Sequence, residues 1–368
     1  MPFCIFAVVA FAVGCSVITG AYDFRVGPSA EAGADAGAPD ADAAPLDPRA
    51  CAECLEHPEL AHPPCAAATT PDAGTGTTHV FAVRSIDFGG MRASWASQRY
   101  AAGLDQDCSE RPDGGTPTSC RPASDPREWV ALPRGIDNAF GAEVIAPLAE
   151  GALATDGGGI DIGLKVTEWI AQGRGGMLVV VDDWNGASDD DAVRVRLLRA
   201  AHPADGGAPS FAPDESWTAY ATAPSVASSA YVSGSTLVAD FRSVGEVPFP
   251  VGNVEGALLE LHLYGFVVSG RITDSTAQLS VAANIGSSGQ RARANLQLLQ
   301  LAVGCDPTLV DAGLATVTQL LESSYDLAVA PVKRGGACNA TSVGLVLDAV
   351  RAAGIANSQE QQLPTSCP

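Results

Sequence analysis

AVRVRLLR, residues 192–199, is the stretch that decides the fold class. Its two valines and Leu197 fall on one side of an extended chain, and two of its arginines, Arg194 and Arg196, fall on the other. Alternation of this kind is typical of a β-strand with one face on a core and the other in water. The stretch therefore predicts an antiparallel sheet that is half buried.

The same alternation recurs on both sides of this stretch. In residues 259–264 three leucines oppose Glu260, His262 and Tyr264. Many short strands joined by turn-rich segments, with no alternating helix, favour an antiparallel β-sandwich or jelly roll over residues 76–303. Further strands are expected at His79–Ile86, Trp129–Leu132, Ile160–Val166, Met177–Val181, Thr236–Phe241, Phe266–Ile272 and Ala277–Val281.

The pattern changes in the last part of the chain, residues 304–368. Asp306 and Pro307 suit the start of a helix, and leucines and valines follow at helical spacing up to Leu321. A second helix is expected over Ser342–Ala353, ending at Gly354. The expected fold is therefore mainly β with two C-terminal helices, stapled by disulfides.

The N-terminal residues have the features of an export signal. Phe3 to Val13 form an apolar run that is too short to span a bilayer as a helix. The run ends in Ala12-Val13-Gly14-Cys15, which resembles the lipobox of bacterial lipoproteins and so predicts a signal peptide at 1–14 and lipidation of Cys15. The alternative is an ordinary secretory peptide cleaved after Ala10-Phe11-Ala12.

An acidic tether is expected to follow the lipid anchor. Residues 29–48 read SAEAGADAGAPDADAAPLDP, which has no apolar periodicity, so residues 15–50 are interpreted as an anchor with a disordered spacer. The whole chain carries 21 basic and 42 acidic residues, a formal charge of −21. Such a charge excludes nucleic acid as a partner, because phosphate would be repelled, and it favours solubility outside the cytoplasm.

Eight cysteines remain beyond Cys4 and Cys15, and an even number in an exported chain predicts four disulfides. Five lie in the first 120 residues, so at least one bridge must join the two ends of the chain if all eight are paired within it. These eight cysteines are Cys51, Cys54, Cys65, Cys108, Cys120, Cys305, Cys338 and Cys367.

Residues 51–75 have a second interpretation. Cys51, Cys54 and Cys65 lie close to His57 and His62, a set of thiols and imidazoles that suits tetrahedral zinc. An oxidising compartment instead favours disulfides with two solvent-exposed histidines, so zinc is the less favoured cofactor.

A calcium site is the most specific chemical hypothesis. The turn DDWNGASDDD, residues 182–191, offers carboxylate and amide oxygens, which calcium prefers. Its spacing does not match an EF-hand loop, and aspartate and glycine also form ordinary turns. The predicted ligands are Asp182, Asp183, Asn185, Asp189, Asp190 and Asp191. Two other turns that contain aspartate, residues 135–138 and 156–161, would join this site only if the fold brought them there.

No catalytic constellation emerges from the sequence. A G-x-S-x-G nucleophile motif and phosphate-binding loops are absent. His262 beside Glu260 is interpreted as part of a solvated strand face rather than an acid–base pair. Five tryptophans would serve carbohydrate stacking if they were exposed, although packing is the simpler role: Trp95, Trp129, Trp169, Trp184 and Trp217.

The chain resembles the Ala- and Gly-rich lipoproteins of high-GC, myxobacterium-like bacteria in its lipobox, acidic tether and cysteine-bearing β domain. This resemblance implies a cell-envelope location and no particular activity. We therefore expect a non-enzymatic binding module, anchored in a membrane by lipid, that binds a glycan with calcium or contacts another envelope protein. The alternatives are an extracellular polymer hydrolase with paired carboxylates, for which acid-rich loops are the motivation, and a structural envelope protein.

Overall fold

β1 (Thr77–Asp87) lies at the centre of one large sheet, between β13 (Ala340–Ala352) and β4 (Gly176–Trp184), and is antiparallel to both. The computed structural model describes residues 76–91, 99–100, 103–104, 138–145, 162–191, 193–254, 257–286, 319, 321–327, 329 and 337–360. Within these ranges no helix is long and apolar enough to cross a membrane.

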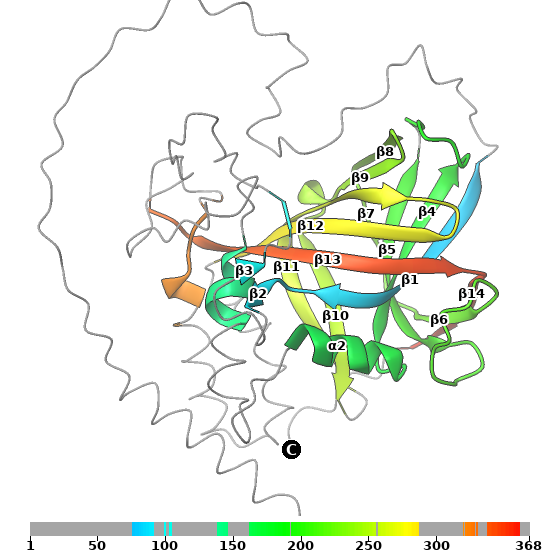
Figure 1. Ribbon diagram of the computed structural model, residues 1–368, viewed down its shortest axis with the longest axis horizontal. Helices are drawn as coiled ribbons and strands as arrows, with labels where there is room; N and C mark the ends of the chain where they lie inside the picture. Colours follow the sequence, from blue (N-terminus) through cyan, green and yellow to red (C-terminus); the bar gives the residue numbers. More distant parts are fainter. Residues whose placement is uncertain are drawn as a thin grey trace, which may run out of the picture.

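The remaining strands extend the sheet on both sides of this centre (Figure 1). The order is β14-β6-β5-β4-β1-β13-β12-β11-β9-β8, with β10 also paired to β11 and β7 to β5. All pairs are antiparallel except β14 with β6. The bounds are β5 (Arg194–Pro203), β6 (Ser216–Tyr220), β7 (Ser225–Val226), β8 (Ser229–Ser233), β9 (Thr236–Asp240), β10 (Glu246–Val254), β11 (Ala257–Ile272), β12 (Thr276–Gly286) and β14 (Gly354–Gln359).

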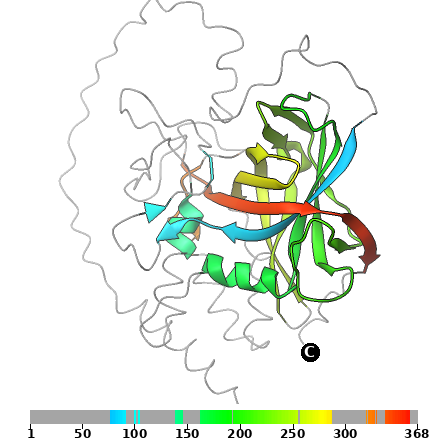
Figure 2. The ribbon, with the colours of Figure 1, turned by 45° about the vertical axis from the view of Figure 1, so that its right-hand side comes forward.

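Short elements accompany the large sheet. A two-stranded ladder and three helical segments lie in the described ranges outside it, besides one turn of helix at residues 321–323. They are β2 (Gly90–Met91), β3 (Arg99–Tyr100), the π-helical turn η3 (Phe140–Ile145), α2 (Ile162–Ala171) and the 3₁₀ turn η5 (Arg242–Val244). α2 lies beside β1 in the two ribbon views (Figures 1 and 2).

The sheet curves so that its distant strands share one core (Figure 2). Val195 and Leu197 of β5 belong to the same buried cluster as Val232 of β8 and Leu237 of β9. Next to this contact, Asp190 and Val232 form an isolated antiparallel bridge. The prediction of a mainly β, antiparallel fold is confirmed. Apart from the β2–β3 ladder, the described strands form one sheet, so the two packed sheets of a sandwich or jelly roll are not seen in the described residues.

A second, smaller core covers the opposite face of the central strands. Val80 of β1 and Leu178 of β4 pack there with Trp217 of β6, next to Phe211 of the preceding loop. The central strands are thus buried on both faces, which explains why Met177–Val181 is a continuous apolar run rather than an alternating one.

The helix expected over residues 342–353 is wrong, because these residues lie in β13. Val343, Leu345, Leu347 and Ala349 are fully buried in the main core, which is the two-residue period of a strand. The valines also fit a helical period, so the ambiguity was resolved by tertiary pairing: β13 lies between β1 and β12 along its length. The helix expected over residues 307–321 lies almost entirely outside the described residues.

The strand expected at Ile160–Val166 is also wrong, because α2 begins at Ile162. Val166 and Ile170, four residues apart, are buried against the main core, whereas Leu164 is exposed. Two residues at this spacing share one face of a helix, and α2 needs only that narrow apolar face because it covers one side of the sheet. The expected strand Trp129–Leu132 lies outside the described residues.

Asn138 holds the turn before η3 against the centre of the sheet. Its Nδ2 donates to the Phe88 carbonyl at 2.7 Å, and its Oδ1 accepts from the backbone N–H groups of Gly141 and Gly344, each at 3.0 Å. All three hydrogen bonds are buried. One amide side chain therefore joins the end of β1, the start of η3 and the middle of β13.

Candidate functional site

The predicted calcium ligands lie at the end of β4 and in the loop that joins it to β5, and protein groups engage several of their carboxylates. Asp182 is buried at the end of β4, where Arg196 Nε donates to it at 2.6 Å and Thr78 Oγ1 at 2.9 Å. Burial acts to raise the pKa of Asp182, but these hydrogen bonds and the charges of Arg196 and Arg194 outweigh it, so the pKa is lowered. Asp182 is thus an ionised partner in a structural ion pair.

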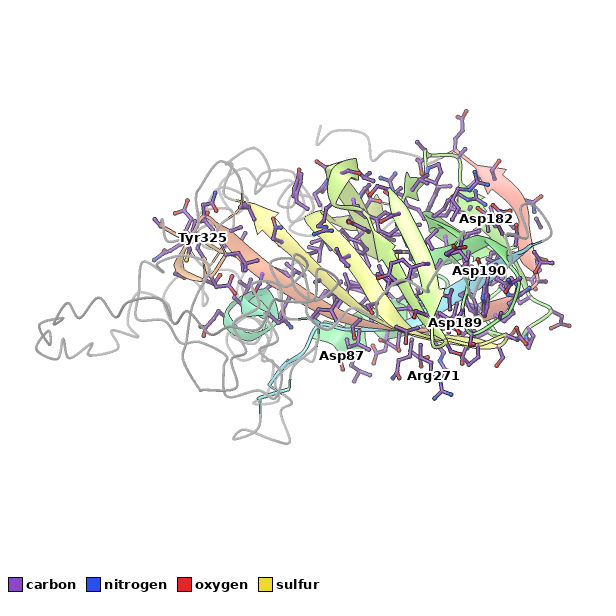
Figure 3. All side chains as sticks on the ribbon, turned by 90° about the horizontal axis from the view of Figure 1, so that it is seen from above. Asp87, Asp182, Asp189, Asp190, Arg271 and Tyr325 are labelled. Atoms are coloured by element: carbon purple, nitrogen blue, oxygen red, sulfur yellow. The ribbon has the colours of Figure 1, made fainter. Side chains whose placement is uncertain are left out.

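Asp189 and Asp190 link this loop to the β8–β9 hairpin. Asp190 exchanges two backbone hydrogen bonds with Val232, at 2.9 and 2.7 Å, and its Oδ2 accepts from the Asn185 N–H at 3.1 Å. Asp189 Oδ1 accepts from the Gly234 N–H at 3.0 Å. That hydrogen bond, with a second from Ser188, lowers the pKa of Asp189. Figure 3 shows Asp182, Asp189 and Asp190 at the end of the molecule away from Tyr325.

The other members of the predicted set do not complete a cation site. Asn185 Oδ1 accepts from the Ala187 N–H at 2.7 Å, and Asp183 lies 3.8 Å from Arg194, while Asp191 is an exposed residue of the same loop. In the part of the chain that the structure describes, no group of three or more His, Cys, Asp or Glu side chains is arranged to hold a metal ion. The loop instead joins β4 and β5 to the far edge of the sheet.

The tryptophans of the described ranges do not form an exposed stacking platform. Trp184 and Trp217 are buried, and Trp169 of α2 packs against the main core. Trp184 also donates from Nε1 to the Ala187 carbonyl at 3.0 Å and lies 4.6 Å, ring to ring, from His79. Trp95 and Trp129 lie outside the described residues.

His79 is a buried histidine with structural partners. Arg351 of β13 donates to its Nδ1, so the proton lies on Nε2, which donates to Thr77 Oγ1 at 2.7 Å. Burial is the main cause that lowers the pKa of His79, and the positive charge of Arg351 lowers it further. The imidazole is therefore kept neutral in the folded protein.

A group of five ionisable side chains on β10, β11 and β5 is linked by short polar contacts. Glu260, His262 and Tyr264 share one face of β11 because they are two residues apart. In the β10–β11 register Glu246 is opposite Tyr264, which brings its carboxylate to the same face. Arg199 of β5 is the fifth member. We call these five residues the carboxylate cluster.

The contacts inside the carboxylate cluster form two linked groups. Tyr264 Oη donates to Glu246 Oε2 at 2.5 Å, and His262 Nδ1 pairs with Glu246 Oε1. Arg199 Nε lies 2.5 Å from Glu260 Oε1, an ion pair that lacks a well-directed hydrogen bond to that oxygen. The Glu246 side chain is 44% exposed and that of Glu260 only 10%, so one carboxylate meets solvent and the other is largely shielded.

Burial raises the pKa of Glu260, and the negative charge of Glu246 raises it further. The positive charge of Arg199 and the charge of His262 act in the opposite direction without cancelling the effect. A carboxyl group with a raised pKa beside a second carboxylate can hold or release a proton, and it can also exchange hydrogen bonds with a hydroxylated ligand. Ionisable groups perturbed in this way gather preferentially at functional sites.

The sequence contained only part of this cluster. Glu260 and His262 were recognised as neighbours on a strand face, but Glu246 and Arg199 were not assigned to it. The missing information is the pairing of β10 with β11, because two prolines in β10, Pro248 and Pro250, conceal the strand pattern. Once the register is known, the proximity of Glu246 to Tyr264 follows.

The remaining predicted sites lie outside the described residues, with one exception. Cys15 and the Cys51 to Cys65 segment with its two histidines belong to ranges that the structure does not describe. Cys338 is described and is engaged in a disulfide. The framework of four bridges stays a prediction, since the other seven cysteines lie outside the described ranges.

No protein-family model matches the chain, and comparisons with curated proteins and with solved structures find no significant similarity.

Proposed function

We propose that the protein is an exported binding module that contacts a hydroxylated ligand, such as a glycan, through the carboxylate cluster. The observation that supports this is the gathering of two carboxylates, a phenol, an imidazole and a guanidinium at one junction of three strands. Carboxylate oxygens accept hydrogen bonds and guanidinium groups donate them, so the cluster offers both kinds of partner to sugar hydroxyl groups.

The ligand contact is placed on this cluster rather than on the loop of residues 182–191. Loop oxygens of Asp182, Asp189 and Asp190 already accept hydrogen bonds from protein donors. Glu246 has the most exposed side chain among the four charged members of the cluster, and Tyr264 positions one of its oxygens. Calcium is therefore not required by this form of the proposal.

Anchoring in a membrane through Cys15 is the second part of the proposal, and the apolar run before that cysteine supports it. Intact mass of the protein purified from its native membrane tests it. A mature chain that starts at Cys15 and carries acyl mass is the expected result. A start elsewhere without lipid would replace the anchor with simple secretion.

The binding proposal is tested on a polysaccharide array with the full chain, with and without EDTA. Binding that survives EDTA and is lost in Glu246→Gln is the expected result. Asp348→Asn is the matched control, because Asp348 is also a partly exposed carboxylate in an ion pair, with Arg84 at 2.7 Å. Equal binding by Glu246→Gln and wild type would show that the carboxylate cluster is not the ligand site. Binding abolished by EDTA would indicate a metal-dependent site, for which residues 182–191 supply the candidate ligands.

A polysaccharide hydrolase is the second candidate, and the raised pKa of Glu260 beside Glu246 favours it. In such enzymes one carboxyl group protonates the leaving oxygen while the other acts as a base or nucleophile. Reducing-end release from any polysaccharide bound on the array, lost in Glu260→Gln, would establish this function. Binding without release would leave the non-enzymatic module.

A further inference from the structure

β14 is a terminal strand of the large sheet, and no bridging residue, proline or charged side chain within the strand blocks its outer edge in the described residues. It is the terminal strand of the sheet order, and among the described strands it has β6 as its only paired neighbour. Residues 355–358 are exposed. A strand at a sheet edge presents unpaired N–H and C=O groups, which makes it a template for a further strand.

The other edge strands carry features that limit strand addition, and β7 is only two residues long. β8 at the opposite end exchanges two backbone hydrogen bonds with Asp190, at 2.9 and 2.7 Å. β10 contains Pro248 and Pro250, which have no N–H to donate. The contrast with β14 is direct, since its sequence GIANSQ has neither a proline nor a charged residue.

The side chains of β14 and its surroundings indicate what kind of strand would pair there. Ile355 is 39% exposed and is one of four large apolar residues exposed in the described ranges. Asp214 and Glu360, both exposed, flank the strand: Asp214 lies two residues before the Ser216 partner of Gly354, and Glu360 directly follows Gln359. A partner strand with an apolar side chain opposite Ile355 and basic side chains near Asp214 and Glu360 would therefore complement this edge. The chain charge of −21 repels a second copy of itself.

We propose that β14 docks an extended, basic peptide segment of a partner protein, which adds as a further strand to the sheet. Backbone hydrogen bonds along the outer edge of β14 supply affinity, and an apolar side chain of the peptide covers Ile355. Lysine or arginine residues of the peptide lie near Asp214 and Glu360. This surface is separate from the carboxylate cluster, so the two proposals stand or fall independently.

The test uses the full chain and a fluorescein-labelled eight-residue peptide of alternating valine and lysine, followed by fluorescence anisotropy. Saturable binding is expected, together with amide hydrogen-exchange protection confined to β14 and its immediate neighbours. Ile355→Lys should weaken binding about fivefold or more, because it replaces a cross-strand apolar contact with a like-charge repulsion. Val226→Lys is the matched control, since Val226 is 37% exposed on a short strand and its substitution adds the same charge.

Four outcomes would overturn the proposal. Equal weakening by Ile355→Lys and Val226→Lys would show that only overall charge attracts the peptide. Undiminished binding of a peptide with proline at alternate positions would exclude strand pairing, and undiminished binding of a peptide with glutamate in place of lysine would exclude a basic partner. Light scattering that shows a dimer dispersed by Ile355→Lys would identify the occupant as a second copy.

Discussion

Replacing Asn138 with alanine is expected to lower the free energy of unfolding by about 3 to 5 kcal/mol. The substitution removes three buried hydrogen bonds, and it leaves the Phe88 carbonyl and the N–H groups of Gly141 and Gly344 without that partner. Each buried polar group left unsatisfied costs about 1 to 3 kcal/mol, and partial relaxation keeps the sum near the lower end of the range.

Urea unfolding followed by tryptophan fluorescence measures this change, because Trp184 and Trp217 are buried in the folded sheet. Asn185→Ala is the matched control: Asn185 makes its hydrogen bond to the Ala187 N–H in an exposed turn, so its loss should cost less than about 1 kcal/mol. A change below about 1 kcal/mol for Asn138→Ala, or equal changes for the two variants, would refute a buried hydrogen-bonded hub.

Three further effects are expected. Gly141→Ala should cost at least about 2 kcal/mol in urea unfolding, because its Cβ would lie 2.2 Å from the Phe88 carbonyl oxygen; a wild-type midpoint would contradict this packing. Asp182→Asn should lower the free energy of unfolding by about 2 kcal/mol at neutral pH, and this loss should vanish in acid. The stability that a lowered pKa supplies is present above the unfolded pKa of 3.8 and disappears as the pH falls through the folded pKa. The pKa of His79 is lowered from 6.5, so the free energy of unfolding should fall as pH drops below about 6.5, because the unfolded chain then binds the proton first. His79→Phe should flatten that part of the profile of stability against pH. An unchanged profile would argue against a buried neutral imidazole.

The first half of β5 shows why an alternating pattern predicts a strand well. Across residues 193–197, which lead into and begin β5, burial reproduces the alternation, with Val193, Val195 and Leu197 inside and Arg194 exposed. Here the local pattern and the tertiary environment agree, so the pattern is sufficient.

The mistakes occur where one pattern fits two periods. Val343, Leu347 and Val350 fit a helix as well as a strand, and only the neighbours β1 and β12 decide between them. β10 was missed for a different reason, since its prolines are typical of a turn and are accepted only because the strand lies at an edge.

The site depends on long-range pairing even more than the fold does. Arg199 and Glu260 come from strands that are not adjacent in the sheet, and no local spacing predicts their contact at 2.5 Å. Residues 182–191 offered carboxylates as cation ligands, but residues 182–184 end β4, and the hydrogen bonds to Val232 and Gly234 that engage Asp190 and Asp189 come from another hairpin. Composition indicates which ligands are available, whereas only the fold shows which are already engaged.

The pairing of β1 with β13 means that the centre of the sheet cannot form until the end of the chain has been synthesised. Arg84 and Asp348 meet across these central strands although 264 positions separate them along the chain. During translation the nascent chain therefore carries β1 and β12 without their shared neighbour until the last strands emerge. A ribosome stalled before residue 340 would hold a chain with two unsatisfied inner edges, and such chains fold slowly and are prone to aggregate.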